Sequence, residues 1–210
     1  MQQTIDPTQT ESPGDKFLKQ LRAATGPMHT ALEANPVSAS LMSPEITSAI
    51  YMRYLSLMSE VISFSEKVVF PALMDIIPDL DQRHKLPQIH ADLHALNFIG
   101  GADMKLFYPV DKSFSVPFAL GYMYVIEGST LGGRVILKHI QSKLGIEEQK
   151  GGSFFSGYGA DTGVRWKGFL SALTKYAEST GTGDEIIKGA QHAFAAIDHY
   201  FAENSVPHAH

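Results

Sequence analysis

The stretch Gly121–Arg134, GYMYVIEGSTLGGR, lies in a segment, residues 118–144, that is strongly helical in pattern apart from three glycines near its middle. Gly128 and Gly132 share one helical face, and Gly133 follows directly. Each glycine inside a helix costs roughly 0.5–1 kcal/mol relative to alanine, so the three cost about 2–3 kcal/mol together. A helix that retains them needs a close neighbour against its backbone or a bend. Two interpretations stay open: a close helix–helix crossing, and a flat ligand pressed against the helix.

Helical spacing of apolar residues also covers most of the remaining chain. No alternation typical of a strand and no internal repeat is visible, so the sequence predicts an all-α fold, a single-domain helical bundle. It predicts a loop with some extended character over 104–117 and helices over 17–34, 45–69, 79–98 and 164–179. A last predicted helix is capped by Asp184 and carries an apolar stripe that reaches Phe201. We expect a mobile N-terminal tail (1–16), a domain over 17–204 and a C-terminal tail (205–210).

Composition excludes several classes of function. A chain of 210 residues is long enough for one domain with a substantial core. The formal net charge of −5 gives no basic field for nucleic acid or an anionic membrane. The absence of cysteine excludes disulfides, iron–sulfur clusters, zinc fingers and cysteine nucleophiles. No apolar run approaches a membrane span, and residues 1–16 lack the pattern of a signal peptide. We therefore expect a cytoplasmic protein that binds neither nucleic acid nor membrane.

A histidine and an arginine share one face of the first predicted helix. Arg22 and His29 are seven residues apart, which places them about 10 Å apart along a helix axis. Imidazole is a common axial ligand of haem iron, and arginine is a natural partner for carboxylates such as the haem propionates. Glu33 lies one turn beyond His29, where it can orient the ring. An ordinary helix histidine beside a solvated arginine is the alternative.

A third segment combines aromatic residues, glycine and cations. Ser153–Tyr158, SFFSGY, leads into Arg165-Trp166-Lys167, and Phe194 and Phe201 follow on the last predicted helix. Such a set can cover an apolar ring and meet its carboxylates. Core aromatics beside a solvated helix start are the alternative.

Taken together in their order along the chain, the three segments resemble the biliverdin-forming haem oxygenase family over nearly all of residues 17–203. Residues 21–33 are similar to the proximal helix of that family, with His29 at its iron ligand and Arg22 at a basic propionate contact. Residues 121–133 resemble its distal helix in the Glu-Gly-Ser-x-Leu-Gly form of bacterial members.

The resemblance implies that haem b is both cofactor and substrate, with its iron held by His29. It implies oxidative ring opening to biliverdin by dioxygen, with release of iron and carbon monoxide. No glycine-rich nucleotide motif opens a βαβ unit, so we expect electrons from an external ferredoxin or flavin reductase. We expect catalytic roles for Gly128, Ser129 and Gly132, and haem contacts from Arg22, His29, Glu33, Tyr124, Gly128, Gly132, Gly133, Arg165, Lys167 and Phe194.

One position departs from the animal-type members, which have an aspartate where this chain has Ser129. The water network of the distal side must then use other groups, and Arg53, Arg83 and Tyr124 are candidate donors. A non-catalytic haem-binding or haem-trafficking protein therefore remains an alternative.

Two further alternatives are weaker. The absence of cysteine argues against a thiaminase-like enzyme of similar fold. His90 and His94 lie one helical turn apart, but no third metal ligand accompanies them.

Overall fold

The computed structural model describes residues 12–100, 104–109 and 114–205, and within these ranges it contains helices and no β-strand. The all-α prediction is therefore confirmed. The α-helices are α1 (Pro13–Ala34), α2 (Pro36–Ser40), α3 (Ser48–Phe64), α4 (Leu86–Ala95), α5 (Val116–Leu144), α6 (Ser153–Ser156), α7 (Thr162–Thr180) and α8 (Gly183–Glu203). Short π or 3-10 turns are η1 (Ser65–Val69), η2 (Phe70–Leu73), η3 (Leu80–Gln82) and η4 (Gly159–Asp161).

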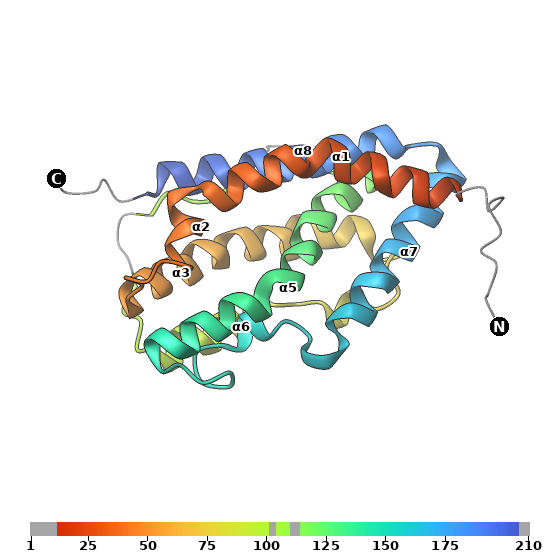
Figure 1. Ribbon diagram of the computed structural model, residues 1–210. Coiled ribbons are helices and arrows are strands. Elements are labelled where there is room, and N and C mark those ends of the chain that lie inside the picture. The colour runs from red at the N-terminus through yellow and green to blue at the C-terminus, as the bar shows by residue number, and fades with distance from the viewer. Residues whose placement is uncertain (1–11, 101–103, 110–113, 206–210) are drawn as a thin grey trace, which may run out of the picture.

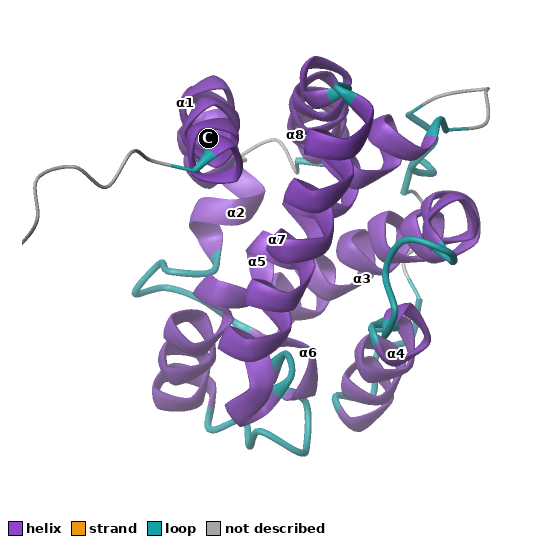
Figure 2. Ribbon diagram, turned by 90° about the vertical axis from the view of Figure 1, so that its right-hand side faces the viewer, coloured by secondary structure: helices purple, strands orange, loops and turns teal. Residues whose placement is uncertain are grey.

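The helices form layers around α5. Helices α1 and α8 lie side by side along one edge, and α5 runs diagonally across the molecule beneath them, changing direction near its middle (Figure 1). Helices α3 and α4 lie on the far side of α5 from α1 (Figure 2). No described helix combines the length and apolar character needed to cross a membrane. This arrangement leaves α1 and the middle of α5 facing each other.

Helices α5 and α8 touch backbone to backbone. A Cβ added at Gly121 would lie 1.9 Å from the Ile186 carbonyl oxygen, and one added at Gly189 would lie 2.2 Å from that of Phe118. Both distances are shorter than any real contact, so this crossing requires glycine on each helix. The close crossing fixes α8 relative to α5.

Several predicted helix ends differ from the observed ones. Helix α1 begins inside the predicted tail, at Pro13, because the Ser12 hydroxyl accepts a hydrogen bond from the Asp15 amide over 3.1 Å. Residues 1–11 and 206–210 of the predicted tails lie outside the described residues.

Local capping and proline explain the other differences. Helix α3 begins at Ser48 rather than residue 45, because the Thr47 hydroxyl accepts from the Ile50 amide over 3.2 Å. The predicted helix 79–98 is divided into η3 and α4, since Pro87 occupies the first turn of α4. The N-cap of α8 is Thr182, so the prediction of Asp184 as the cap was wrong.

Candidate functional site

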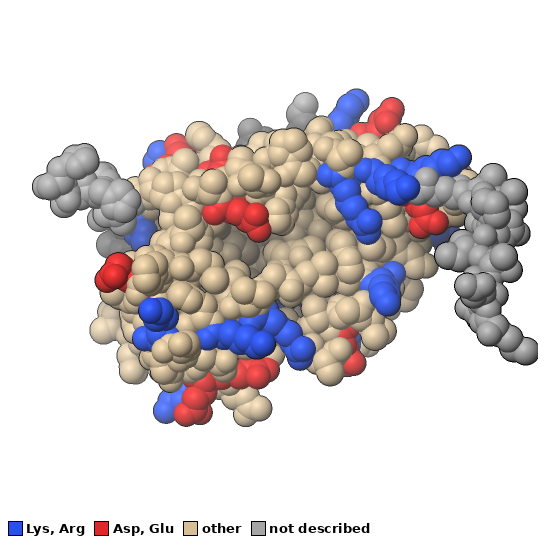
Figure 3. Space-filling model, in the orientation of Figure 1, with Lys and Arg blue, Asp and Glu red and all other residues tan. Residues whose placement is uncertain are grey.

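A cavity of about 990 Å³ opens between α1 and α5. Residues of α3, α6, α7 and α8 complete its walls. Figure 3 shows the face hollowed at this place, with Lys and Arg side chains to the right of the hollow and below it. The cavity brings together most of the predicted site residues: Arg22, His29, Glu33, Tyr124, Gly128, Ser129, Gly132, Gly133 and Phe194.

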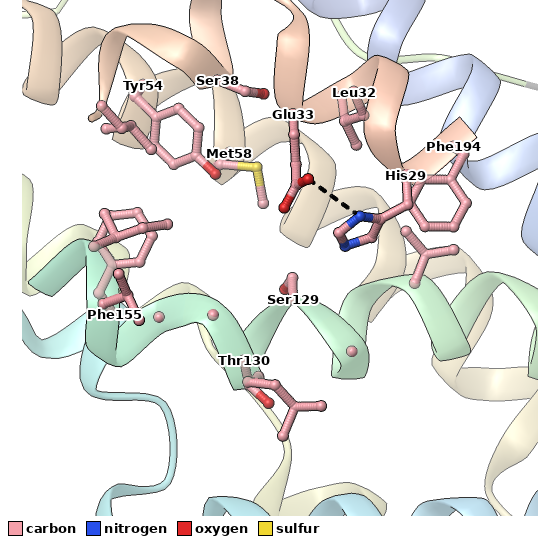
Figure 4. A pocket seen from close by; sticks show the side chains of 18 of the residues that line it. His29, Leu32, Glu33, Ser38, Tyr54, Met58, Ser129, Thr130, Phe155 and Phe194 are labelled. Atoms are coloured by element: carbon pink, nitrogen blue, oxygen red, sulfur yellow. Dashed lines mark ion pairs between the residues drawn. The ribbon is translucent and has the colours of Figure 1, made fainter. Parts of the chain in front are cut away.

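His29 projects from α1 into the open part of this cavity. Its Nδ1 lies 3.5 Å from an oxygen of Glu33, one turn further along the helix. Its ring meets the Phe194 ring edge to face, with 5.8 Å between the centroids. Figure 4 shows the second ring nitrogen turned toward α5. The side chain is 59% exposed, so a ligand entering the cavity can reach this nitrogen.

The glycines of α5 divide into two kinds. A Cβ added at Gly133 would lie 2.5 Å from the Phe155 carbonyl oxygen, so this glycine permits the close approach of α6. A Cβ at Gly132 would meet nothing within 4 Å, and one at Gly128 would only touch the Trp166 ring at 3.6 Å. Helix packing therefore explains Gly133, as the helix-crossing interpretation requires, whereas it does not explain Gly128 or Gly132.

Ser129 lies between these glycines and rises from α5 toward the cavity below Glu33 (Figure 4). Its hydroxyl donates to the Ile126 carbonyl oxygen over 2.7 Å. The proton of the hydroxyl is therefore used within the helix, and the oxygen faces the cavity as an acceptor.

Of the three candidate donors for a distal water network, only Tyr124 lines the cavity. Burial raises the pKa of its phenol, while Arg22 and Thr25 beside it oppose that shift. Arg53 donates to the Asn204 carbonyl oxygen instead. Arg83 is 1% exposed and held by carboxylates outside the cavity wall.

The two cations predicted from α7 do not line the cavity. Arg165 forms an ion pair with Asp79 at 3.0 Å and donates to the Gln82 side chain at 3.0 Å, so its guanidinium is already occupied. Lys167 is exposed at the surface of α7. Trp166, between them, does line the cavity.

Sequence reasoning missed a group of residues that close the cavity at its sides. Their helical spacing is the same as that of ordinary core residues, and Lys85 stands in a polar stretch with no motif, so the sequence carries no signal for them. They are Ser38, Leu41, Met42, Tyr54, Met58, Lys85 and Phe154.

His90 and His94 do not line the cavity. Among the described residues, no group of three or more metal-ligating side chains lies close enough together to hold an ion.

Both the sequence and the fold of this chain are similar to those of known haem oxygenases. The haem oxygenase family model matches residues 109–203. The haem oxygenase of Neisseria meningitidis, solved with NO and CO bound, is 24% identical with a TM-score of 0.71, over 92% of this chain and 94% of that one. Haem oxygenase 2 of Chlamydomonas reinhardtii, solved without haem, is 14% identical with a TM-score of 0.74, over 92% and 99%.

Haem oxygenase-1 of the cyanobacterium Synechocystis, solved in complex with haem, is 17% identical with a TM-score of 0.71, over 89% of this chain and 91% of that one. A comparison with curated proteins found no match. The structural matches show that the chain has the all-helical fold of the haem oxygenases. The haem oxygenase family model matches residues 109–203 of this chain, in agreement with the resemblance that the sequence indicated.

Proposed function

We propose that this protein is a haem oxygenase that binds haem between α1 and α5, holds its iron through His29 and opens its ring to biliverdin. The observation that carries the proposal is that an imidazole and two bare glycines face each other across one cavity. The match of residues 109–203 and the fold support the same activity.

The residues of the cavity fit a haem. A flat apolar ring needs apolar walls, and Leu32, Met58 and Phe155 supply them. An iron at the ring centre needs one strong ligand, which His29 would offer. On the opposite wall, Gly128 and Gly132 carry no side chain that would keep a ring from the backbone.

On the α1 side, Glu33 and Phe194 hold the imidazole in place. The carboxylate beside Nδ1 favours the tautomer with its proton on that nitrogen, leaving the lone pair of Nε2 for iron. The edge-to-face contact with Phe194 restricts rotation of the ring. The two residues therefore orient the proposed ligand before iron arrives.

On the α5 side, the chain supplies shape and exclusion of water. Gly128 and Gly132 let the backbone approach the ring, and the Ser129 oxygen can accept a hydrogen bond from a water molecule in the cavity. When bound, haem supplies the redox chemistry with dioxygen, and the protein orients it. We propose that the electrons come from an external ferredoxin or flavin reductase.

Charge sets the direction in which haem enters. Arg22 lines the cavity on one side of His29 and Glu33 lies on the other. The propionates of haem are attracted by the guanidinium and repelled by the carboxylate, so we propose that they point toward Arg22. In this orientation, apolar lining residues such as Leu41 would be available to the vinyl and methyl groups.

The test is single turnover of the protein reconstituted with hemin. A ferric Soret band should form, and ascorbate with oxygen should bleach it and yield biliverdin, identified by chromatography. We expect His29→Ala to abolish ring opening, and added imidazole to restore part of it by filling the space left by the side chain.

The matched control is His199→Ala, because His199 is 76% exposed on α8 and lies outside the cavity. This variant should turn over at the rate of the unmodified protein. A stable oxygen complex without bleaching would show a haem-binding protein without turnover, and normal ring opening by His29→Ala would show that iron is held elsewhere.

A further inference from the structure

A buried carboxylate stands directly before the glycine-bearing turn of α5. Glu127 is 1% exposed and precedes Gly128. One of its oxygens lies 3.1 Å from the Lys85 ammonium nitrogen and accepts from the Tyr158 hydroxyl over 2.7 Å. The other oxygen is paired with the Arg83 guanidinium.

The partners of Glu127 come from distant parts of the chain. Arg83 and Lys85 follow η3, whereas Tyr158 lies just before η4. Arg83 is itself held by Asp79 at 2.8 Å and donates to the Arg165 carbonyl oxygen at 3.0 Å. The Glu127 carboxylate therefore ties α5 to the stretch after η3 and to the start of α7.

This cluster touches the cavity at two places. Lys85 lines the cavity, and its ammonium lies 3.9 Å from the centroid of the Tyr158 ring. Thr130, also in the lining, donates to the Glu127 carbonyl oxygen over 2.7 Å. Displacement of Glu127 would therefore move the wall of the cavity.

Burying these charges is costly. Desolvation lowers the pKa of the Lys85 ammonium, although Glu127 attracts the charged form. Apolar residues of similar size would fill the same space with a smaller desolvation cost, so stability alone does not account for the cluster. Hydrogen bonds and ion pairs are directional, whereas apolar packing is not. The contacts of Glu127 therefore fix one turn of α5 in one position.

We propose that Glu127, held by Lys85, Arg83 and Tyr158, is a positioning residue that anchors α5 directly before Gly128 and so confines movement of the helix to the turn Gly128–Gly133. The anchor would set how closely that turn approaches a bound ring, and this consequence rests on the proposed function. Anchoring itself is a property of the protein without haem.

The first test therefore uses the protein without haem. Amide hydrogen exchange of residues 128–133 reports opening of that turn. We expect Glu127→Gln to speed exchange there by about tenfold or more. Tyr158→Phe removes the hydrogen bonds of the hydroxyl with Glu127 and Lys85 but no charge, and should speed exchange by a smaller factor. The control Glu203→Gln breaks the exposed ion pair with Lys105 and should leave this exchange unchanged.

A double variant separates anchoring from charge neutralisation. Glu127→Gln with Lys85→Met removes the carboxylate together with one of its cations, so the unfolding temperature lost in Glu127→Gln should recover. If Glu127 is an anchor, residues 128–133 still exchange fast in the double variant. Recovery of slow exchange there, or unchanged exchange in both Glu127→Gln and Tyr158→Phe, would overturn the proposal.

The second test adds hemin. The Soret maximum of Tyr158→Phe should differ from that of the unmodified protein, since the turn over the ring is displaced, whereas that of Glu203→Gln should not. Suppose that exchange is fast in the Glu127 and Tyr158 variants but that the unmodified protein forms no Soret band with hemin. That result would support the anchor and reject the proposed function. An unchanged Soret maximum with slow exchange would reject the anchor.

Discussion

At the scale of single residues, Ser129 is the position that separates this chain from the animal-type pattern. Its proton goes to the Ile126 carbonyl oxygen, so the side chain can only accept hydrogen bonds from the cavity. We expect Ser129→Ala to slow biliverdin formation by less than about tenfold, the effect of one lost hydrogen bond. Single-turnover absorption measures it. A loss of several hundredfold would show that the hydroxyl turns and donates into the cavity.

Arg22 is the charged residue that should align the haem carboxylates. It lies on the exposed side of α1, so water and salt screen its charge. We expect Arg22→Gln to weaken hemin binding by about three- to tenfold at low salt, and by less at high salt. Arg134→Gln is the matched control, because Arg134 is an exposed arginine outside the cavity lining. Equal effects of the two variants would contradict a specific contact.

At the scale of elements, two adjacent glycines of α5 should respond in opposite ways to the same change. Gly133→Ala places a methyl group 2.5 Å from the Phe155 carbonyl oxygen, and we expect a loss of about 1–3 kcal/mol in the free energy of unfolding. Gly132→Ala meets no atom within 4 Å, and we expect a gain of about 0.5–1 kcal/mol.

The stabilising variant Gly132→Ala should nevertheless bind haem less tightly than the unmodified protein. The methyl group at residue 132 projects into space that a ring would occupy, so Gly132→Ala should bind hemin more weakly although its unfolding temperature is higher. Thermal unfolding without haem and a hemin titration measure the two effects. A Gly132→Ala variant that binds as tightly as the unmodified protein would place the ring away from this turn.

The elements that carry the site were predictable from the sequence. Periodicity located α1 and α5, and the spacing of Arg22, His29 and Glu33 placed these residues on one face of a helix, where the structure has them lining one cavity. Periodicity does not specify where a helix stops, since that depends on single hydrogen bonds such as the one from the Ile50 amide to the Thr47 hydroxyl.

Contacts between distant segments were not predictable. Arg165 is a cation beside an aromatic residue in the sequence, but Asp79, 86 positions away, takes its guanidinium. The partners of Glu127 are likewise separated from it by 44, 42 and 31 positions. A single sequence gives no measure of which distant charges will be buried together.

At the scale of the whole molecule, the fold assigns different tasks to the two walls of the cavity. The α1 wall carries His29 and Glu33 on a helix whose N-terminus is capped by Ser12. The α5 wall is held to α8 through Gly121 and Gly189, and to two loops through Glu127. In the turn that follows these attachments, a Cβ added at Gly132 would meet nothing within 4 Å, and one at Gly128 would only touch the Trp166 ring.

This arrangement makes one tryptophan a reporter of the whole site. Trp166 is the only tryptophan of the chain, and it lines the cavity beside Tyr124 with 5.5 Å between ring centroids. Haem absorbs where tryptophan emits, so hemin binding should quench nearly all of the emission, with an end point at one haem per chain. A Soret band that forms while the emission persists would place haem outside this cavity.

The same titration predicts a change in stability, because a ligand that binds only the folded chain stabilises it by mass action. At a free hemin concentration 100 times the Kd, the free energy of unfolding should rise by about 2.7 kcal/mol. For a chain of this length that corresponds to an unfolding temperature higher by about 5–10 °C. Unfolding followed by circular dichroism measures it, with His29→Ala as the comparison. Both helices, α1 and α5, must be folded to bind haem between them. If hemin changed the Soret signal but left the unfolding temperature measured by circular dichroism unchanged, haem would not connect α1 to α5.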